Sequence, residues 1–357
     1  MKGFLVLEDK TVFEGKFAGN PQWKSVGEVV FNTSMVGYQE VITDPSYFQQ
    51  IVVMTAPEQG NYGVDLRERE SGRVYAEGFI CVNLNSSENP SRKNLSDELL
   101  EFKRPSLSEI DTRTLTLHLR SRGTPWGVIM QSENRDDVLK VSQKLIDERR
   151  NSISKDWVYE TSSKEMKVFN GTGKLGRVAL YDYGTKNTIV SELQKRFKEV
   201  AVFNSRTDAK KILDWAPLGL VLSNGPGDPA DVVGAAAEIK KLLGQIPVFG
   251  ICMGHQILAL ALGGKTYKLK FGHRGSNHPV QNLKTGEIYM TAQNHGYAVS
   301  PDLPTGVKVS QINLYDKTVE GIEAEKLKAW SVQYHPEAGP GPHDSRVLFD
   351  YFAKGIL

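Results

Sequence analysis

Apolar residues in the second half of the chain recur in short, nearly continuous runs that alternate with stretches of helical spacing. The runs lie at 177–181, 199–203, 218–222 and 246–251, and helices are predicted at 188–196, just before Trp215, at 234–243 and at 254–262. Strands that are apolar throughout and alternate with helices are typical of a parallel sheet covered on both faces. The pattern predicts an α/β domain with a doubly wound, mostly parallel sheet over 177–357.

The remaining segments show other patterns. Strands are predicted at 287–291, 307–312, 321–324 and 329–334, before a last helix at 344–353. The first 150 residues mix β-type runs at 3–7, 28–31, 51–55 and 79–84 with helical stretches at 95–102, 114–122 and 136–149. Segment 151–176 is polar and rich in Ser, Thr, Lys and Gly, without sustained periodicity. We therefore expect a mixed α/β domain over 1–150 and a linker over 151–176.

Length and composition agree with two globular domains. A chain of 357 residues is too long for one ordinary core, and 39% hydrophobic and 24% charged residues are ordinary values. The net charge of +2, from 44 basic and 42 acidic residues, gives no reason to expect nucleic acid or an anionic membrane as a partner. No apolar stretch approaches membrane-spanning length, and the start of the chain is too soon acidic for a signal peptide, so we expect a cytoplasmic protein.

Cys252 is the strongest candidate for chemistry. It lies at the centre of segment 250–254, Gly-Ile-Cys-Met-Gly, between a predicted strand and a predicted helix. A Gly-x-nucleophile-x-Gly turn in this place is a nucleophile elbow, whose glycines allow a sharp, strained bend. A helix N-terminus also favours a thiolate. A buried structural cysteine is the alternative, but it explains neither glycine; the other cysteine, Cys81, lies in a different half and offers no disulfide framework.

Two further segments supply what a cysteine nucleophile needs. His335 follows a predicted strand, and Glu337 lies two residues on, with Pro336 fixing the backbone between them. This spacing predicts a base oriented by a carboxylate. Loop 222–229 follows another parallel strand and should face the same crevice, where the backbone N–H groups of Met253 and Gly227 can stabilise an oxyanion.

Together these motifs carry a resemblance to a known family. Segments 249–256, 224–229 (Asn-Gly-Pro-Gly-Asp-Pro) and 335–337 resemble, in the expected order, the three signatures of the class I (triad) glutamine amidotransferases. Segments 31–47, 110–113 and 271–279 resemble the small, glutamine-hydrolysing subunit of carbamoyl-phosphate synthetase. This second similarity runs nearly end to end.

The resemblance implies a mechanism and a set of contacts. Cys252 attacks the side-chain amide of glutamine, and ammonia and a γ-glutamyl thioester result; His335 moves the proton and Glu337 holds the imidazole. The glutamine contacts implied by matching position are Ser46, Gly225, Gly227, Met253, Gln256, Asn294, Gly296 and Tyr297. Family members often carry Leu at position 253 and Phe at position 297, and the Tyr297 hydroxyl has no assigned role. Because Ser46 belongs to the first domain, we expect the pocket to lie between the two domains.

The resemblance also implies a partner, since ammonia released into neutral water is protonated and loses its nucleophilicity. The expected partner is the large subunit of carbamoyl-phosphate synthetase, which would hold ATP, bicarbonate and Mg²⁺. We expect no cofactor in this chain: segment 171–176 fits G-x-G-x-x-G but precedes a strand, and Ala259 replaces the first glycine of a P-loop that would end at 264–266. No metal is predicted, because His273 and His278 lack further spaced ligands.

Three alternatives remain open from the sequence. A cysteine hydrolase that cleaves peptides or γ-glutamyl chains would share the elbow and the acid–base pair, and an assay comparing glutamine with γ-glutamyl peptides separates the two. Amidotransferases of guanine, anthranilate or cytidine nucleotide synthesis carry other appended domains or none. An inactive scaffold subunit is disfavoured by the intact Cys252, His335 and Glu337. The sequence does not decide between arginine and pyrimidine synthesis.

Overall fold

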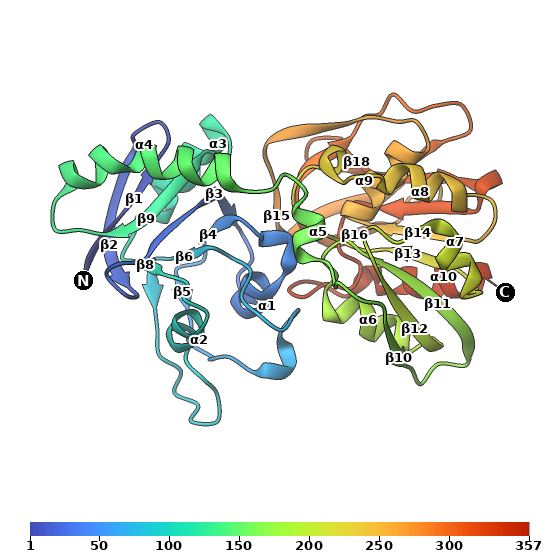
Figure 1. Cartoon of the computed structure of the whole chain (residues 1–357), viewed down its shortest axis with the longest axis horizontal. Helices are drawn as coiled ribbons and strands as arrows, with labels where there is room; N and C mark the ends of the chain where they lie inside the picture. The colour runs from blue at the N-terminus through green and yellow to red at the C-terminus, as the bar shows by residue number, and fades with distance from the viewer. Residues whose placement is uncertain (357) are drawn as a thin grey trace. The chain divides into compact units, whose positions relative to one another are not determined.

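The computed structural model of the chain describes residues 1–356. It divides into two compact units, Met1–Ser154 and Lys155–Leu357, here called the amino-terminal and carboxy-terminal units (Figure 1). Within the described residues, no helix combines the length and the apolar character needed to cross a bilayer.

The amino-terminal unit is built on a closed β-barrel. Its strands follow the order β1 (Lys2–Leu7), β2 (Val12–Ala18), β8 (Ser106–Ser108), β6 (Gly78–Ile80), β4 (Gln50–Met54), β3 (Lys24–Asn32) and β9 (Trp126–Gln131), and β9 pairs with β1. Helix α4 (Arg135–Ser152) covers one side of the barrel, where Val138 and Ile146 join a core with Phe4 and Val128 (Figure 1). A mixed α/β domain was expected here; the closure of its strands into a barrel was not.

The connections of this unit carry its short elements. These are α1 (Tyr38–Thr43), η1 (Pro45–Tyr47), β5 (Glu58–Gln59), η2 (Leu66–Glu68), β7 (Asn83–Leu84), α2 (Leu95–Glu101) and α3 (Thr112–Arg122). Helices α2, α3 and α4 agree with the predicted stretches at 95–102, 114–122 and 136–149. Segment 31–47, which carries part of the family resemblance, contains the end of β3 followed by α1 and η1.

A ten-stranded sheet forms the centre of the carboxy-terminal unit. Its parallel part consists of five neighbouring strands in the order β12 (Phe197–Asn204), β11 (Leu175–Asp182), β13 (Leu220–Leu222), β14 (Val248–Ile251) and β19 (Ala329–Val332). Antiparallel strands extend it beyond β19, in the order β18 (Val319–Ala324), β16 (Ile288–Val299), β15 (Thr266–Asn282) and β17 (Lys308–Asn313). Strand β10 (Lys167–Asn170) pairs antiparallel with β12 at the opposite edge.

Helices cover both faces of the parallel part, because each strand buries side chains on both sides. Helices α7 (Ala209–Asp214), α8 (Ala235–Leu242) and α9 (Met253–Ala261) contribute to one apolar cluster, and α6 (Asn187–Gln194) and α10 (Val347–Ile356) contribute to the other. Short 3-10 helices, η3 (Pro229–Asp231), η4 (Glu325–Leu327) and η5 (Asp344–Arg346), lie in the connections. The predicted doubly wound α/β architecture is confirmed.

The segment that was expected to be a linker carries regular structure. After α4 ends at Ser152, helix α5 (Trp157–Thr161) and strand β10 follow, and both belong to the carboxy-terminal unit. Strand β10, Lys-Val-Phe-Asn, is short and exposed along its whole length, so its sequence shows no apolar–polar alternation that would reveal a strand.

Four adjacent parallel strands position the candidate chemistry. Strands β11, β13, β14 and β19 lie side by side and end at Asp182, Leu222, Ile251 and Val332. Because parallel strands end at the same edge of a sheet, the residues that follow them converge there.

Candidate active site

Cys252 lies at a strained junction between β14 and α9. Its backbone adopts φ 52° and ψ −102°, a left-handed φ that is rare for a residue with a side chain. The Cys252 N–H donates to the carbonyl of Val332 on the neighbouring strand (2.9 Å), which helps to hold this conformation. The thiol is buried and lies 3.6 Å from the carbonyl oxygen of Asn294.

The two glycines of the elbow are required by close backbone contacts. A Cβ on Gly250 would lie 2.7 Å from the carbonyl oxygen of Gly254, and a Cβ on Gly254 would overlap the carbonyl group of Leu222. The Gly254 N–H donates to the carbonyl of Ser223 (2.9 Å), so the elbow is tied to the end of β13. The sharp bend predicted from the sequence is therefore present.

His335 and Glu337 form a buried pair after β19. Nδ1 of His335 lies 2.7 Å from Oε1 of Glu337, and both side chains are almost inaccessible to solvent. The His335 N–H donates to the carbonyl of Ala292 (2.9 Å), an antiparallel bridge that fixes the segment against β16. Nε2 of His335 is not engaged by any other side chain among the described residues, and the interaction of the ring with Cys252 makes it the nitrogen left to act on the thiol.

Lys186 is a member of this site that sequence reasoning missed. Its ammonium lies 3.1 Å from Oε1 of Glu337 and also donates to the carbonyl of Ala338, and its side chain is only 2% exposed. The turn from β11 to Lys186 is fixed by Asp182, whose Oδ1 accepts from the N–H groups of Gly184 and Thr185. The available signal was a lysine placed just after a buried parallel strand.

The charges of the site act on one another. Burial lowers the pKa of His335, but the negative charges of Glu337 and Cys252 outweigh it and raise the pKa of His335 to about 10. Burial raises the pKa of Glu337, but the positive charges of Lys186 and His335 outweigh it and lower the pKa of Glu337 to about 2. In a buried site, an opposite charge beside an ionisable side chain favours its ionised form, here the His335 imidazolium and the Glu337 carboxylate. The arrangement therefore stabilises a proton on His335 beside the Glu337 carboxylate.

The loop after β13 lies against the same edge of the sheet. The side-chain oxygen of Asn224 accepts from the Lys186 N–H (3.1 Å), and Gly225 lies so close to the carbonyl of Tyr183 that no Cβ fits between them. Gly227 has φ +89°, a left-handed backbone that favours glycine. Met253 is the first residue of α9, so its N–H belongs to the helix end that lacks intrahelical acceptors.

Most of the residues implied to contact glutamine lie in the carboxy-terminal unit. Gln256, one turn after Cys252 on α9, donates from Nε2 to the carbonyl of Tyr297 (2.8 Å) and to Oε1 of Gln333 (3.1 Å). Asn294, Gly296 and Tyr297 lie together on β16, and Asn294 contacts the Cys252 sulfur through its carbonyl oxygen. Ser46 belongs to the amino-terminal unit, where it lies buried in η1 and its N–H donates to Asp44.

One group of buried side chains has the composition of a cation site. Possible ligand atoms of His273, His295 and Glu320 lie within 4.8 Å of one another. They belong to β15, β16 and β18, which are neighbours in the sheet but far apart in the sequence. Sequence spacing pairs His273 with His278 and does not indicate this group.

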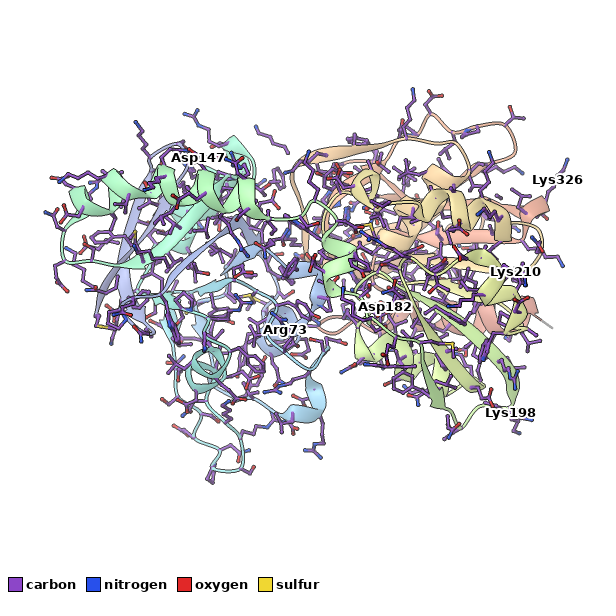
Figure 2. The ribbon with its side chains drawn as sticks, viewed as in Figure 1. Arg73, Asp147, Asp182, Lys198, Lys210 and Lys326 are labelled. Carbon is purple, nitrogen blue, oxygen red and sulfur yellow. The ribbon has the colours of Figure 1, made fainter. Side chains whose placement is uncertain are left out.

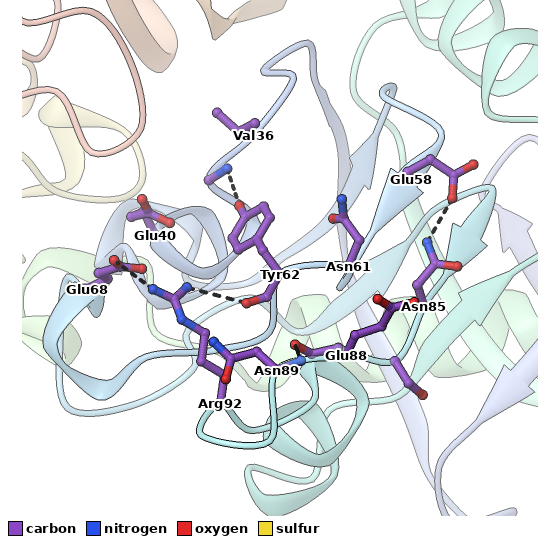
Figure 3. A pocket seen from close by; sticks show the side chains of 13 residues that line it. Val36, Glu40, Glu58, Asn61, Tyr62, Glu68, Asn85, Glu88, Asn89 and Arg92 are labelled. Carbon is purple, nitrogen blue, oxygen red and sulfur yellow. Dashed lines mark hydrogen bonds and ion pairs between the residues drawn. The ribbon is translucent and has the colours of Figure 1, made fainter.

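A surface cavity of about 980 Å³ lies in the amino-terminal unit. Its lining is rich in acidic and amide side chains and contains neither cysteine nor histidine (Figure 3). Arg92 crosses it, with NH1 3.4 Å from the carbonyl of Tyr62 and NH2 3.4 Å from Glu68. The cavity holds no acid–base pair of the kind that His335 and Glu337 form.

Comparisons with known proteins agree with both halves of the predicted resemblance. Residues 179–354 match the family model "Glutamine amidotransferase class-I", and residues 5–129 match "Carbamoyl-phosphate synthase small chain, CPSase domain". The carbamoyl phosphate synthase small chain of Clostridium acetobutylicum is 45% identical over 358 residues, which cover 99% of this chain and 100% of that one. The small chain of Clostridium perfringens is 46% identical and covers 100% of both chains.

The pyrimidine-specific small chain of carbamoyl phosphate synthase from Bacillus subtilis is 45% identical over 360 residues, which cover 100% of this chain and 96% of that one. Identity at this level extends through both units, so the motifs are not a local coincidence. The chain belongs to the carbamoyl phosphate synthase small chain family, and the family resemblance predicted from its motifs is confirmed.

Proposed function

We propose that this chain hydrolyses glutamine at Cys252 and passes the ammonia to a synthetase chain that makes carbamoyl phosphate. The observation that carries the proposal is the buried His335–Glu337 pair, with Nδ1 2.7 Å from the carboxylate and Nε2 left for the thiol of Cys252. Family membership over the whole chain supports the same activity.

The first step is attack by Cys252. His335 takes the thiol proton, and the sulfur forms a bond to the amide carbon of glutamine, whose carbonyl electrons move onto oxygen. The N–H groups of Met253 and Gly227 are the proposed donors to this oxyanion. Glu337 keeps Nδ1 of His335 protonated and oriented, and Lys186 holds Glu337 as a carboxylate.

The second step releases ammonia. The tetrahedral intermediate collapses, its C–N bond breaks, and His335 delivers its proton to the leaving nitrogen. Water then attacks the γ-glutamyl thioester and gives up a proton to His335. The C–S bond breaks and His335 returns the proton to the sulfur, so that glutamate is released and the free thiol is restored.

The proposed partner is the large subunit of carbamoyl-phosphate synthetase. Ammonia must stay unprotonated to react, which favours direct transfer to a bound partner. ATP, bicarbonate and Mg²⁺ are expected on that chain. The proposed substrate contacts remain Ser46, Gly225, Gly227, Met253, Gln256, Asn294, Gly296 and Tyr297.

Synthesis by the reconstituted complex tests the proposal. Cys252→Ala should abolish carbamoyl phosphate formation from glutamine and leave formation from added ammonia unchanged. Cys81→Ala, which alters the other buried thiol, is the matched control and should keep both activities. Loss of both activities in Cys252→Ala, or retention of the glutamine-dependent one, would overturn the proposal.

A γ-glutamyl or peptide hydrolase would use the same three side chains. The measurement that separates the two is the ratio of kcat/KM for glutamine to that for γ-glutamyl peptides. We expect glutamine to be preferred by at least about a hundredfold, since the buried Cys252 and His335 leave little room for a substituent on the amide nitrogen. A preference for the peptides would favour the hydrolase.

A further inference from the structure

A closed ring of hydrogen bonds lies beside the proposed glutamine contacts. We call it the Glu320 ring, and its members are Glu320, Gln293, His295, Tyr297, Gln256 and Gln333. Gln293 donates from Nε2 to Oε2 of Glu320 (2.9 Å), and its Oε1 lies 2.9 Å from Nε2 of His295. Nδ1 of His295 lies 2.7 Å from the carbonyl oxygen of Tyr297.

The other half of the ring passes through the nucleophile helix. Nε2 of Gln256 donates to the carbonyl of Tyr297 (2.8 Å) and to Oε1 of Gln333 (3.1 Å), and the N–H of Gln333 donates back to the carbonyl of Glu320 (2.8 Å). Every side chain in this half is buried, except that of Tyr297, which is half-buried. Such a ring fixes its members together, because breaking one bond leaves a buried polar group unsatisfied.

The ring is connected to the reacting atoms on three sides. Gln256 follows Cys252 by one turn of α9, and Gln333 precedes His335 by two residues. Between them, segment 294–297 of β16 supplies the Asn294 carbonyl that lies 3.6 Å from the Cys252 sulfur. A displacement of the ring would therefore move the surface on which glutamine is proposed to bind.

Glu320 brings a buried negative charge to this ring. Its side chain is fully buried, Nδ2 of Asn313 donates to its Oε1 (3.0 Å), and Nδ1 of His273 lies 3.6 Å from the same oxygen. Hydrogen bonds to a charged acceptor are stronger and more directional than those between neutral groups. Glu320 is thus the member best able to hold the Gln293 amide, and through it the His295 ring, in one orientation.

A metal ion is the competing explanation for this cluster. The hydrogen bonds argue against it, because Glu320 accepts from two amides and Nδ1 of His295 is engaged by Tyr297. His273 also lies 2.8 Å from Asp316. Burial lowers the pKa of His273, but Glu320 and Asp316 outweigh it and raise that pKa. Glu320 and Asp316 therefore favour the protonated form of the His273 imidazole.

We propose that Glu320 is a positioning residue for glutamine: through Gln293 and His295 it fixes segment 294–297 and so the place of the substrate amide against Cys252. This inference rests on the proposed function. It assigns Glu320 no contact with the reacting atoms, so its removal should weaken substrate binding more than the chemical step.

Steady-state glutamine hydrolysis by the complex tests this role. Glu320→Ala should raise KM for glutamine about tenfold while kcat stays within about threefold of wild type. Glu320→Gln keeps an oxygen for the Gln293 amide and should restore KM to within about threefold. The control is Glu323→Ala, on the same strand β18 but outside the ring, which should leave KM unchanged.

The outcomes against the proposal are specific. An unchanged KM in folded Glu320→Ala, an equal rise in Glu323→Ala, or a loss of activity that follows the folded fraction measured by circular dichroism would overturn it. So would one equivalent of divalent metal found in the wild-type chain and absent from Glu320→Ala, since the ion would then hold the ring.

A second measurement does not depend on glutamine hydrolysis. Amide hydrogen exchange over 293–297 should be about tenfold faster in Glu320→Ala than in wild type or Glu323→Ala. Unchanged exchange overturns the positioning role. A wild-type complex that fails to hydrolyse glutamine would instead overturn the proposed function. The exchange result would then still test whether Glu320 fixes segment 293–297.

Discussion

The ammonium of Lys186 lies 3.1 Å from Oε1 of Glu337, the same oxygen that lies 2.7 Å from Nδ1 of His335. Glu337 therefore has a cation on each side, although its side chain is fully buried. A buried carboxylate is unfavourable without such compensation, and a buried pair is strongly destabilised when one partner is removed. The lysine and the carboxylate thus act as a unit.

Lys186→Met tests this unit through acid stability. Because the folded-state pKa of Glu337 lies near 2, below its ordinary value of 4.5, Glu337 contributes stability above about pH 4.5 that is lost as the pH falls through about 2. Without Lys186 that pKa rises, so the contribution shrinks and acid unfolding moves to higher pH. We expect a loss of about 3 kcal/mol in the free energy of unfolding near neutral pH.

Circular dichroism across an acid titration, with urea unfolding at neutral pH, provides the measurement. Lys210→Met is the control, because Lys210 projects from the outside of the carboxy-terminal unit (Figure 2) and pairs with the exposed Asp214. Equal acid midpoints for Lys186→Met and wild type would reject the role of the buried pair.

The thiol chemistry of Cys252 should depend on His335. Since the pKa of His335 is raised to about 10, its protonated form is favoured through the neutral range, and a neighbouring cation favours a thiolate over a thiol. Alkylation of Cys252 by iodoacetamide near pH 7 should therefore be at least about tenfold faster than in His335→Asn. A Cys81→Ala background removes the second thiol, and equal rates in the two proteins would contradict the pairing.

Substitutions within the acid–base pair should differ in severity. His335→Asn removes the group proposed to move the proton and should lower kcat/KM for glutamine by more than about a thousandfold. Glu337→Gln leaves the imidazole in place but weakens its orientation and its charge, so we expect a smaller loss, of about tenfold to a hundredfold. Initial rates of glutamate release measure both, and the reverse order would mean that another residue is the base.

The elbow glycines should tolerate no side chain. In Gly254→Ala the new Cβ would overlap the carbonyl group of Leu222, so β13 or α9 must shift. Activity should fall at least about a hundredfold, and the melting temperature should also fall. Gly355→Ala, in α10, meets open space and is the matched control, which should be neutral or slightly stabilising. Full activity of Gly254→Ala would show that the close approach is not needed.

The parallel half of the sheet and the elbow were predictable because both have local signals. Apolar runs with intervening helical spacing mark each strand, and the pattern Gly-x-Cys-x-Gly marks the bend at Cys252. The contact between His335 and Glu337 was also predictable, since the two residues are only two positions apart.

Contacts between distant segments were not predictable from one sequence. A lone lysine gives no sign of burial, and the partner of Lys186, Glu337, is 151 residues away in the sequence, in the turn that follows β19. The closure of the amino-terminal barrel depends on pairing between β1 and β9, at opposite ends of that unit. Glu320 and Gln293 likewise meet through pairing of antiparallel strands, which residue spacing does not encode.

The convergence of β11, β13, β14 and β19 has a consequence for biogenesis. Each strand is followed by residues of the candidate site, and long stretches of sequence separate the strands that pair with one another. Pairing strands that are remote in the sequence costs conformational entropy of the chain, so the sheet is completed late in folding. An incompletely folded chain therefore lacks the assembled site, and the ability to cleave a carboxamide appears only when the sheet is complete.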